Sequence, residues 1–147
     1  MNNVLKIKKL REKAVVPKYA TSGAAGMDLY ACIDEAVTLE PQKLLMIPTG
    51  IAIELPSAEL AAFIHARSGL GVKHGICLGN GVGVVDSDYR GEVCVGLCNV
   101  SDTPYTIEPN ERVAQMVIAP VAVMQIEEVE ELSDTARGEG GFGSTGR

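Results

Sequence analysis

The sequence predicts an all-β fold, an antiparallel sandwich or barrel. Its 147 residues are the usual size of one domain and suffice for one hydrophobic core. The 16 glycines and 7 prolines lie between short apolar runs, a pattern typical of many short strands joined by turns. No amphipathic segment is long enough for a helix that crosses over between parallel strands. An antiparallel arrangement follows by elimination.

The expected strands are the apolar runs, taken in chain order. The first covers residues 4–7, and residues 44–48 and 51–55 flank Thr49-Gly50, which we interpret as a hairpin turn. Further strands are expected at residues 61–66, 76–78, 82–85, 93–99, 105–107, 112–118 and 121–129. Helical turns are expected only at residues 57–60 and 68–73.

Composition and charge exclude several classes of function. The formal net charge of -6 argues against a general DNA or RNA binder, although a nucleotide site needs only a few local cations. No run is apolar enough to span a membrane, and the first residues lack a signal-peptide pattern. The four cysteines include no C-x-x-C pair and favour reduced thiols. We therefore expect a cytoplasmic protein, or an intracellular viral or phage-encoded one, without nucleic-acid or membrane partners.

A dense group of polar residues, 86–92, follows one of the apolar runs. Asp86 and Asp88 stand at alternate positions, so on a continuing strand they would point to opposite faces and would not share one metal. The preceding Gly79-Asn80-Gly81 offers backbone that can approach a ligand closely. A surface turn with an Asp cap is the structural alternative. Two acids beside a tyrosine and an arginine favour a functional site instead.

Three other strings contain candidate ligand-binding residues. Arg67-Ser68-Gly69 combines a guanidinium fork, a hydroxyl and an open amide, which suit phosphate oxygens at the start of a helical turn. Asp28 is an acid in an apolar run, and a carboxylate satisfied by backbone amides is the structural alternative there. Arg112 and Gln115 cannot lie on one face of a regular strand, so their roles should differ, with a structural ion pair favoured for Arg112.

The end of the chain differs from the rest because it is rich in glycine and lacks aliphatic core residues. We expect residues 1–132 to form the catalytic β-domain and residues 133–147 a flexible arm. A cation, one aromatic ring and two hydroxyls stand among the glycines and suit closure over a charged ligand. These residues are Arg137, Phe142, Ser144 and Thr145.

Taken in order, five strings resemble the motif series of one enzyme family. They are AGMDL, RSGL, NGVGVVDSDYRGE, RVAQM and RGEGGFGSTG, of which the third and fifth are long and specific. The series is similar to that of the trimeric deoxyuridine triphosphate diphosphatases (dUTPases), from about residue 20 to the end. The resemblance implies a jelly-roll-like subunit, a homotrimer with shared sites, and Mg²⁺-dependent hydrolysis of dUTP to dUMP and pyrophosphate. That reaction would limit uracil incorporation into DNA and supply dUMP for thymidylate synthesis.

The resemblance also implies roles for the residues that would contact the nucleoside. Asp86 would hold the 3′-hydroxyl and orient the water that attacks the α-phosphorus. Tyr89 would pack against the deoxyribose and leave no room for a 2′-hydroxyl. A hairpin would read uracil through its backbone, with contributions from Asn80, Gly83, Val84 and Val85.

The remaining matched residues are implied at the phosphates and in the arm. The phosphates would be bound by Arg67, Ser68, Gly69, Gln115 and Arg137. The arm would close over a neighbouring subunit's site, where Phe142 stacks on uracil and Gly143, Ser144 and Thr145 help to clamp the phosphates. Mg²⁺ would bind mainly through phosphate oxygens and waters, with Asp28 acting at most through a water.

Two alternatives remain open from the sequence. The dCTP deaminases share the fold expected of this family, but they need a different acidic residue, and DSDYRGE and GFGSTG favour the diphosphatase. A nucleotide-binding or regulatory protein that has kept the pocket is the non-enzyme alternative, against which Asp86, Tyr89 and Phe142 weigh. The exact roles of Asp28, Arg112 and Cys94 are left open.

Overall fold

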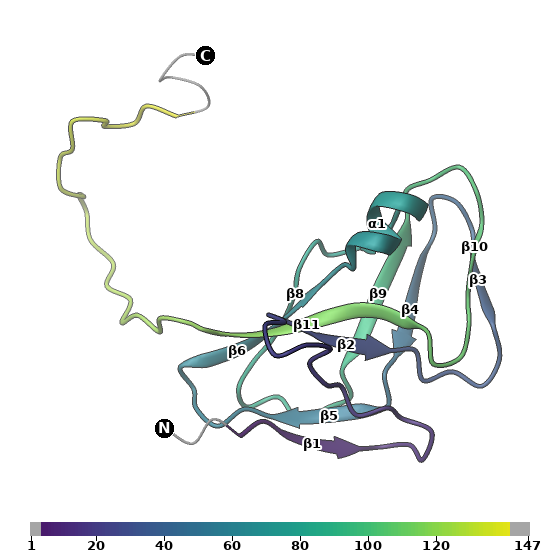
Figure 1. Cartoon of the computed structure of the whole chain (residues 1–147). Coiled ribbons are helices and arrows are strands. Elements are labelled where there is room, and N and C mark those ends of the chain that lie inside the picture. The colour runs from purple at the N-terminus through teal and green to yellow at the C-terminus, as the bar shows by residue number, and fades with distance from the viewer. Residues whose placement is uncertain (1–3, 142–147) are drawn as a thin grey trace.

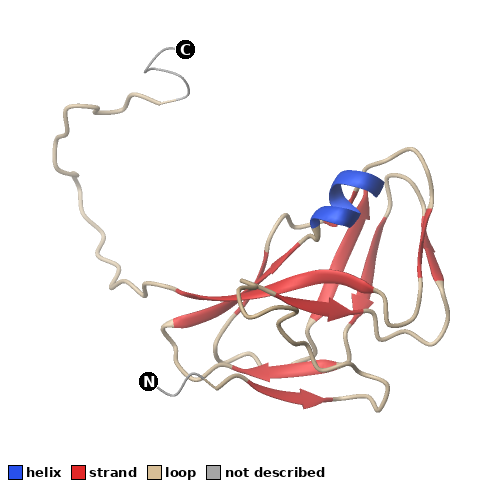
Figure 2. Ribbon diagram, in the orientation of Figure 1, coloured by secondary structure: helices blue, strands red, loops and turns tan. Residues whose placement is uncertain are grey.

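Eleven strands and one helix form the part of the chain that the computed structural model describes, residues 4–141. The all-β prediction is confirmed, and Figure 2 shows that strands and loops make up nearly all of the body. The elements are β1 (Lys6–Lys9), β2 (Met27–Tyr30), β3 (Val37–Leu39), β4 (Leu44–Pro48), β5 (Ile51–Glu54), β6 (Leu60–His65), α1 (Ser68–His74), β7 (Ile76–Leu78), β8 (Gly83–Val85), β9 (Cys94–Asn99), β10 (Tyr105–Ile107) and β11 (Arg112–Pro120).

The strands form a jelly-roll-like arrangement of antiparallel sheets (Figure 1). One sheet has the order β2-β11-β6-β8 and a second has β4-β9-β7, while β1-β5 and β10-β3 are two-stranded. Each of the pairings is antiparallel. Most partners are distant in the chain: Gln115 of β11 lies opposite Asp28 of β2 on one side and His65 of β6 on the other. The sheets thereby bring the ends of distant motifs together.

The core joins both larger sheets and is built almost wholly from aliphatic side chains. Along β9, Val95 and Leu97 are buried while Cys94 is exposed, the period of two expected of a strand with one covered face. Leu29 of β2 and Met116 of β11 are equally inaccessible. Burying one such side chain contributes roughly 1.5–3 kcal/mol. Many Val, Ile and Leu side chains thus offset the lack of tryptophan.

The turn at Thr49-Gly50 does not form the hairpin that its sequence predicts. β4 pairs with β9 whereas β5 pairs with β1, so the chain passes from one sheet to another at this point. Gly50 has a φ of +71°, and a Cβ there would lie 2.7 Å from Cys32 Sγ, so a glycine is required on both counts. Thr49-Gly50 correctly predicts a sharp bend, but the burial of β4 and β5 in different sheets decides their partners.

The helical turn expected at residues 68–73 is confirmed as α1. It begins after Arg67, whose backbone is extended (φ -86°, ψ 134°), and ends at Gly75, whose left-handed φ of 68° lets its N–H donate to the Gly71 carbonyl at 3.1 Å. The other expected helical turn, residues 57–60, is a single turn without helix. Within residues 4–141, no helix has the length and apolar character needed to cross a bilayer.

The strand predicted at residues 121–129 is absent from the described structure. β11 ends at Pro120, and among residues 121–141 only the Val121 N–H is bonded back to the body, to the Glu59 carbonyl at 2.8 Å. The following segment extends away from the sheets (Figure 1). Its apolar side chains are exposed, among them Met124 at 74% and Ile126 at 94%. Apolar alternation predicts a strand only where a partner edge is present, and no described strand pairs with this segment.

Candidate active site

The β7–β8 turn presents an open backbone edge beside the acidic residues. The Gly81 N–H donates to the Leu78 carbonyl at 3.1 Å, and Gly81 has a φ of +74°, which a side chain would disfavour. β7 and β8 pair with different sheets, so the expected hairpin at residues 81–85 is a turn that links two sheets. Among the described strands, β8 is the last of its sheet and pairs only with β6, so its other edge is open to a ligand in this part of the chain.

Gly83, Val84 and Val85, which the sequence predicts to read a base, make up this edge strand. The Val84 side chain is 61% exposed. A Cβ at Gly83 would lie 3.1 Å from Ile64 Cβ and 3.7 Å from the Asn80 side-chain nitrogen, so the Asn80 amide lies close to the Gly83 backbone. The structure therefore brings the four predicted uracil-reading residues together.

The loop of residues 86–92, here called the 86–92 loop, places Asp86 and Tyr89 beside β8. The Tyr89 N–H donates to the Asp86 carbonyl at 3.2 Å, and the Tyr89 hydroxyl donates to the Glu92 carbonyl at 3.0 Å. The ring lies against Gly91, where a Cβ would be 2.3 Å from the Tyr89 oxygen. A residue with a side chain at this position would force the tyrosine to move.

Asp86 and Tyr89 border a hollow of about 250 Å³, here called the Asp86 hollow. It is lined by Met46, Val84, Val85, Asp86, Tyr89, Glu92, Val93 and Cys94. Burial raises the pKa of the Cys94 thiol, the charge of Glu92 raises it further, and Arg11 opposes both. A raised pKa favours the protonated thiol, which is a poorer nucleophile than the thiolate.

A second group of predicted residues surrounds Asp28. Arg67 Nε lies 2.9 Å from Asp28 Oδ1, and Arg112 Nη1 lies 3.2 Å from Asp28 Oδ2. The Asp28 side chain is only 18% exposed, so its two arginine partners satisfy a largely covered carboxylate. Ser68 and Gly69 follow Arg67 in the first turn of α1, and both are exposed. Cations, a hydroxyl and free first-turn amides thus gather in one place.

Arg112 and Gln115 lie on the same side of β11, contrary to the expectation for a regular strand. The register shifts between Arg112 and Ala114, where Tyr30 and Leu29 are the successive partners, so Val113 is an extra residue. Val113 and Ala114 are both buried, whereas Arg112 contacts Asp28 and the Gln115 amide donates to the Ala66 carbonyl at 3.0 Å. The bulge therefore adds Arg112 to the group around Asp28.

The two groups of residues are not linked to each other by any side-chain bond of the described residues, although β8 and β11 both pair with β6. In residues 4–141, no hydrogen bond or ion pair joins Asn80, the β8 strand, Asp86 or Tyr89 to Arg67 or Gln115. Arg137 belongs to the extended tail, and its Nε donates to the Gly140 carbonyl at 2.7 Å. Phe142, Gly143, Ser144 and Thr145 lie outside the described residues.

Sequence reasoning missed Arg11 and the role of Glu92, although Glu92 ends the longest motif. Glu92 Oε2 lies 3.3 Å from Arg11 Nη2, and Glu92 Oε1 accepts a hydrogen bond from the Gly50 N–H at 2.8 Å. These partners come from parts of the chain far from residue 92, so spacing gave no signal. The Glu92 carboxylate thus links the end of the 86–92 loop to Gly50 and Arg11.

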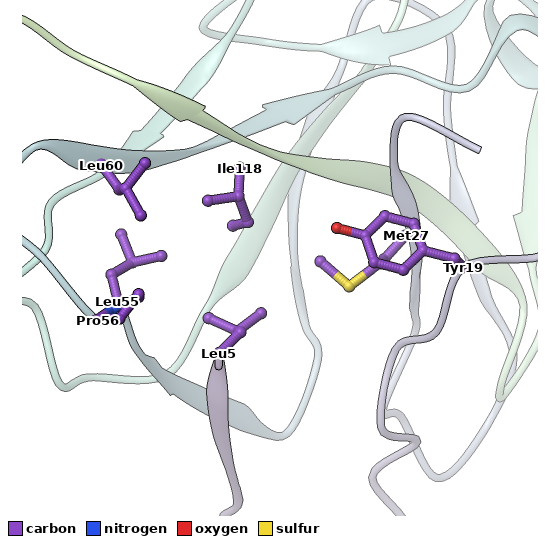
Figure 3. A pocket seen from close by; sticks show the side chains of 7 residues that line it. All are labelled: Leu5, Tyr19, Met27, Leu55, Pro56, Leu60 and Ile118. Atoms are coloured by element: carbon purple, nitrogen blue, oxygen red, sulfur yellow. The ribbon is translucent and has the colours of Figure 1, made fainter. Parts of the chain in front are cut away.

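A larger hollow of about 460 Å³ lies apart from both groups. Figure 3 shows that apolar side chains surround it: Leu5, Tyr19, Met27, Leu55, Pro56, Leu60 and Ile118. It contains none of the predicted site residues. An apolar lining without cations does not suit a triphosphate, so this hollow is not the candidate active site.

Comparisons with known proteins agree with the motif series. A family model described as dUTPase matches residues 12–146. The deoxyuridine 5′-triphosphate nucleotidohydrolase of Neisseria meningitidis serogroup A is 53% identical over 148 residues, which cover 99% of both chains. The protein of the same name from Desulfitobacterium hafniense is 52% identical over 131 residues, covering 89% of this chain and 87% of the relative.

The fold agrees as well. The dUTPase of Staphylococcus bacteriophage 80alpha, solved with dUpNHpp, matches with a TM-score of 0.89 at 29% identity and covers 99% of this chain and 100% of the phage chain. Sequence, fold and the grouping of polar residues therefore lead to one family. The chain belongs to the dUTPase family, the enzymes that hydrolyse dUTP.

Proposed function

We propose that Asp86 activates the water that cleaves dUTP into dUMP and pyrophosphate. Water oxygen would bond to the α-phosphorus, the bond from that phosphorus to the α,β-bridging oxygen would break, and pyrophosphate would leave. Asp86 would accept the proton that the water loses. The observation that carries the proposal is the position of Asp86, directly after the open edge of β8 and on the wall of the Asp86 hollow.

Base selection is proposed to rest on the free edge of β8. A uracil held against this edge would exchange hydrogen bonds with the backbone of Gly83 and Val85, as a further strand would. Cytosine presents a donor where uracil presents an acceptor, so a polar group would be left unpaired. Thymine carries an additional methyl group, which a turn closely fitted to uracil would exclude.

Sugar selection is proposed to rest on Tyr89. Its hydroxyl is bonded to the Glu92 carbonyl and its ring lies over Gly91, so the ring is held at the wall of the Asp86 hollow. A deoxyribose would pack on this ring. A ribose would place its 2′-hydroxyl against the ring carbons, where it has neither space nor a hydrogen-bond partner.

The phosphates are proposed to bind to the group around Asp28. Arg67, Ser68 and Gly69 offer a guanidinium, a hydroxyl and a first-turn amide, and Gln115 offers its side-chain amide. Asp28 itself is engaged by two arginines, which disfavours direct ligation of a metal. Residues 4–141 also contain no group of three or more His, Cys, Asp or Glu side chains able to hold one.

A Mg²⁺ requirement fits these residues if the ion arrives with the triphosphate. Phosphate oxygens and waters would be its main ligands, and Asp28 would contact it through a water. When bound, the ion would neutralise part of the charge on the phosphates. The protein's own contribution would be to position the α-phosphorus against Asp86 by means of Arg67 and Gln115.

A homotrimer with shared sites would unite the two groups of residues. Within the described part of one chain, no hydrogen bond or ion pair joins Asp86 or Tyr89 to Arg67. The segment after β11 also exposes apolar side chains such as Met124 and Ile126. Both features suit an assembly in which one subunit supplies Asp86 and another supplies Arg67. Residues 133–147 would then form the arm that closes a neighbour's site, with Arg137 and Phe142 in it.

We also propose an intracellular location, where the substrate occurs.

Turnover of a panel of nucleotides tests the proposal. The purified protein is supplied with dUTP, dCTP, dTTP or UTP, with Mg²⁺ or with a chelator, and both pyrophosphate and ammonia are measured. We expect pyrophosphate from dUTP alone, only with Mg²⁺. Ammonia from dCTP would indicate a deaminase, and binding of dUTP without any product would indicate a nucleotide-binding protein.

A further inference from the structure

We infer that Arg11 and Glu92 form a positioning unit for the reaction, which fixes the 86–92 loop against the body of the protein. The inference deepens the proposed function and rests on the roles proposed there for Asp86 and Tyr89. Neither Arg11 nor Glu92 belongs to the group around Asp28, to which the phosphates are proposed to bind, although Glu92 lines part of the Asp86 hollow. Their effect would pass through the loop, whose backbone carries both Asp86 and Tyr89.

The Glu92 carboxylate uses both of its oxygens. Oε1 accepts the Gly50 N–H at 2.8 Å, and Oε2 lies 3.3 Å from Arg11 Nη2. The Glu92 side chain is 23% exposed, so the pair is partly shielded from water. On the backbone side, the Glu92 carbonyl accepts the Tyr89 hydroxyl at 3.0 Å. One residue therefore connects the ring of Tyr89 to two distant segments.

The other end of the unit is fixed in the body. Arg11 Nη1 donates to the Cys32 carbonyl at 3.2 Å. The Gly50 carbonyl accepts the Leu10 N–H at 2.7 Å, and Gly50 has no room for a side chain beside Cys32. The anchor for Glu92 is thus a rigid corner between two sheets.

Other bonds of the 86–92 loop are local or weak. The Tyr89 N–H bonds to Asp86, and Arg90 donates to the Ser87 and Tyr89 carbonyls at 2.8 and 2.9 Å. Arg90 Nε is 4.0 Å from Glu54 Oε2, which is a loose contact between exposed side chains. Local bonds give the loop its shape, and its two ends are held by the pairing of β8 with β6 and by backbone bonds of Val93 to Thr49 and Ile51. Between these ends, the Glu92 carboxylate is the strongest side-chain link from the loop to the body.

Positioning and stability should respond differently to loss of the pair. Arg11 is half exposed, and an ion pair of that kind adds little to the stability of the fold. A shift of about 1 Å in a reacting group can nevertheless lower a rate about 10²-fold. Loss of the unit should therefore reduce kcat and the preference for dUTP over UTP, with a small effect on the melting temperature.

The test uses Arg11→Met, Glu92→Gln, Glu92→Ala and the Arg11→Met/Glu92→Gln double variant. Lys13→Met is the matched control, because Lys13 lies two residues after Arg11 and pairs with Asp34 at 2.7 Å, away from the loop. For each protein, kcat and KM are measured with dUTP and with UTP, together with the melting temperature and the oligomeric mass.

We expect Arg11→Met and Glu92→Gln each to lower kcat/KM for dUTP about 10-fold, mainly through kcat, and to reduce the dUTP-to-UTP ratio. Glu92→Ala should lose more, since it also frees the Gly50 N–H. The double variant should lose no more activity than the less active single variant, because Arg11→Met and Glu92→Gln both remove the same Arg11–Glu92 contact. Lys13→Met should match the native protein.

The inference would be overturned if Arg11→Met and Lys13→Met changed kcat/KM for dUTP equally. It would also be overturned if the ratio of kcat/KM values for dUTP and UTP stayed unchanged while the losses of the two single variants added up in the double variant. If Glu92→Ala does not fold, the comparison of Arg11→Met with Lys13→Met decides alone. The native protein and Asp86→Asn are measured alongside. A native protein inactive on dUTP would overturn the proposed function together with this inference, whereas an active one with normal Arg11 and Glu92 variants would overturn this inference only.

Discussion

The Tyr89 hydroxyl donates a hydrogen bond of 3.0 Å to the Glu92 carbonyl, three residues further along the same loop. This bond, together with the close approach of the ring to Gly91, fixes the tyrosine at the wall of the Asp86 hollow. The proposed discrimination between deoxyribose and ribose follows from a ring that these two contacts hold in place.

Replacing Tyr89 should reveal which part of the side chain selects the sugar. Tyr89→Ala opens space beside C2′ and removes ring contact, so activity on dUTP should fall while the preference for dUTP over UTP shrinks. Tyr89→Phe keeps the ring and should retain most of the preference. The measurement is the ratio of kcat/KM values for dUTP and UTP. An unchanged ratio in Tyr89→Ala would place sugar discrimination elsewhere.

The two arginines that bind Asp28 should differ in their importance for catalysis. Arg67→Met removes a proposed phosphate ligand and should lower kcat/KM for dUTP roughly 10- to 10²-fold, the range for a lost hydrogen bond to a charged group. Arg112→Met removes the other partner of the same carboxylate and should have a smaller effect. Steady-state kinetics of both variants compare them directly. A larger loss in Arg112→Met would assign phosphate binding to Arg112 instead.

Much of this division of roles could be predicted from the sequence, but the geometry around Asp28 could not. Arg67 and Gln115 have side chains that suit phosphate, and the resemblance to the dUTPase motif series adds Asp28 to them. Arg112 joins them only through the bulge in β11, and a bulge depends on how the strand fits its partner. Propensity along one strand carries no information about that fit.

The contact between Arg11 and Glu92 shows the same limit at longer range. The two residues are 81 positions apart and meet only because the segment after β1 and the corner at Gly50 lie side by side. The predicted strand at residues 121–129 failed for a related reason. Its alternation is present, but the partner that would complete a sheet is not among the described strands.

Removal of residues 133–147 should separate assembly from catalysis. The tail after β11 exposes its apolar side chains before residue 133, so the shortened protein should remain a trimer. Loss of Arg137 and Phe142 with the proposed arm should reduce dUTP turnover by about 10²-fold or more, because the substrate would no longer be enclosed. Light scattering and pyrophosphate release give the two readouts. If the shortened protein were a monomer, or kept full activity, shared sites closed by an arm would be contradicted.

Alkaline unfolding should report the environment of Tyr105. Burial, the hydrogen bond from its hydroxyl to Glu111 and the charge of Glu111 together raise its pKa from 10.0 to about 12. The raised folded-state pKa favours the protonated phenol, so its stabilising effect is fully present below pH 10 and is lost as the pH rises toward 12. Tyr105→Phe has no such proton, so the stability gap between the native protein and this variant should narrow across that window. Urea unfolding at several pH values measures the gap; a constant gap would contradict the assignment.

The rate of Asp86→Asn tests the central claim most directly. The amide keeps the shape of the carboxylate and its hydrogen bonding to the sugar, but it cannot accept the proton of the attacking water. We expect dUTP to bind with nearly native affinity while kcat falls by about 10²–10⁴-fold. Asp88→Asn is the matched control, because Asp88 lies in the same loop but does not line the Asp86 hollow, and it should leave kcat unchanged. A kcat for Asp86→Asn close to that of the native protein would contradict the account.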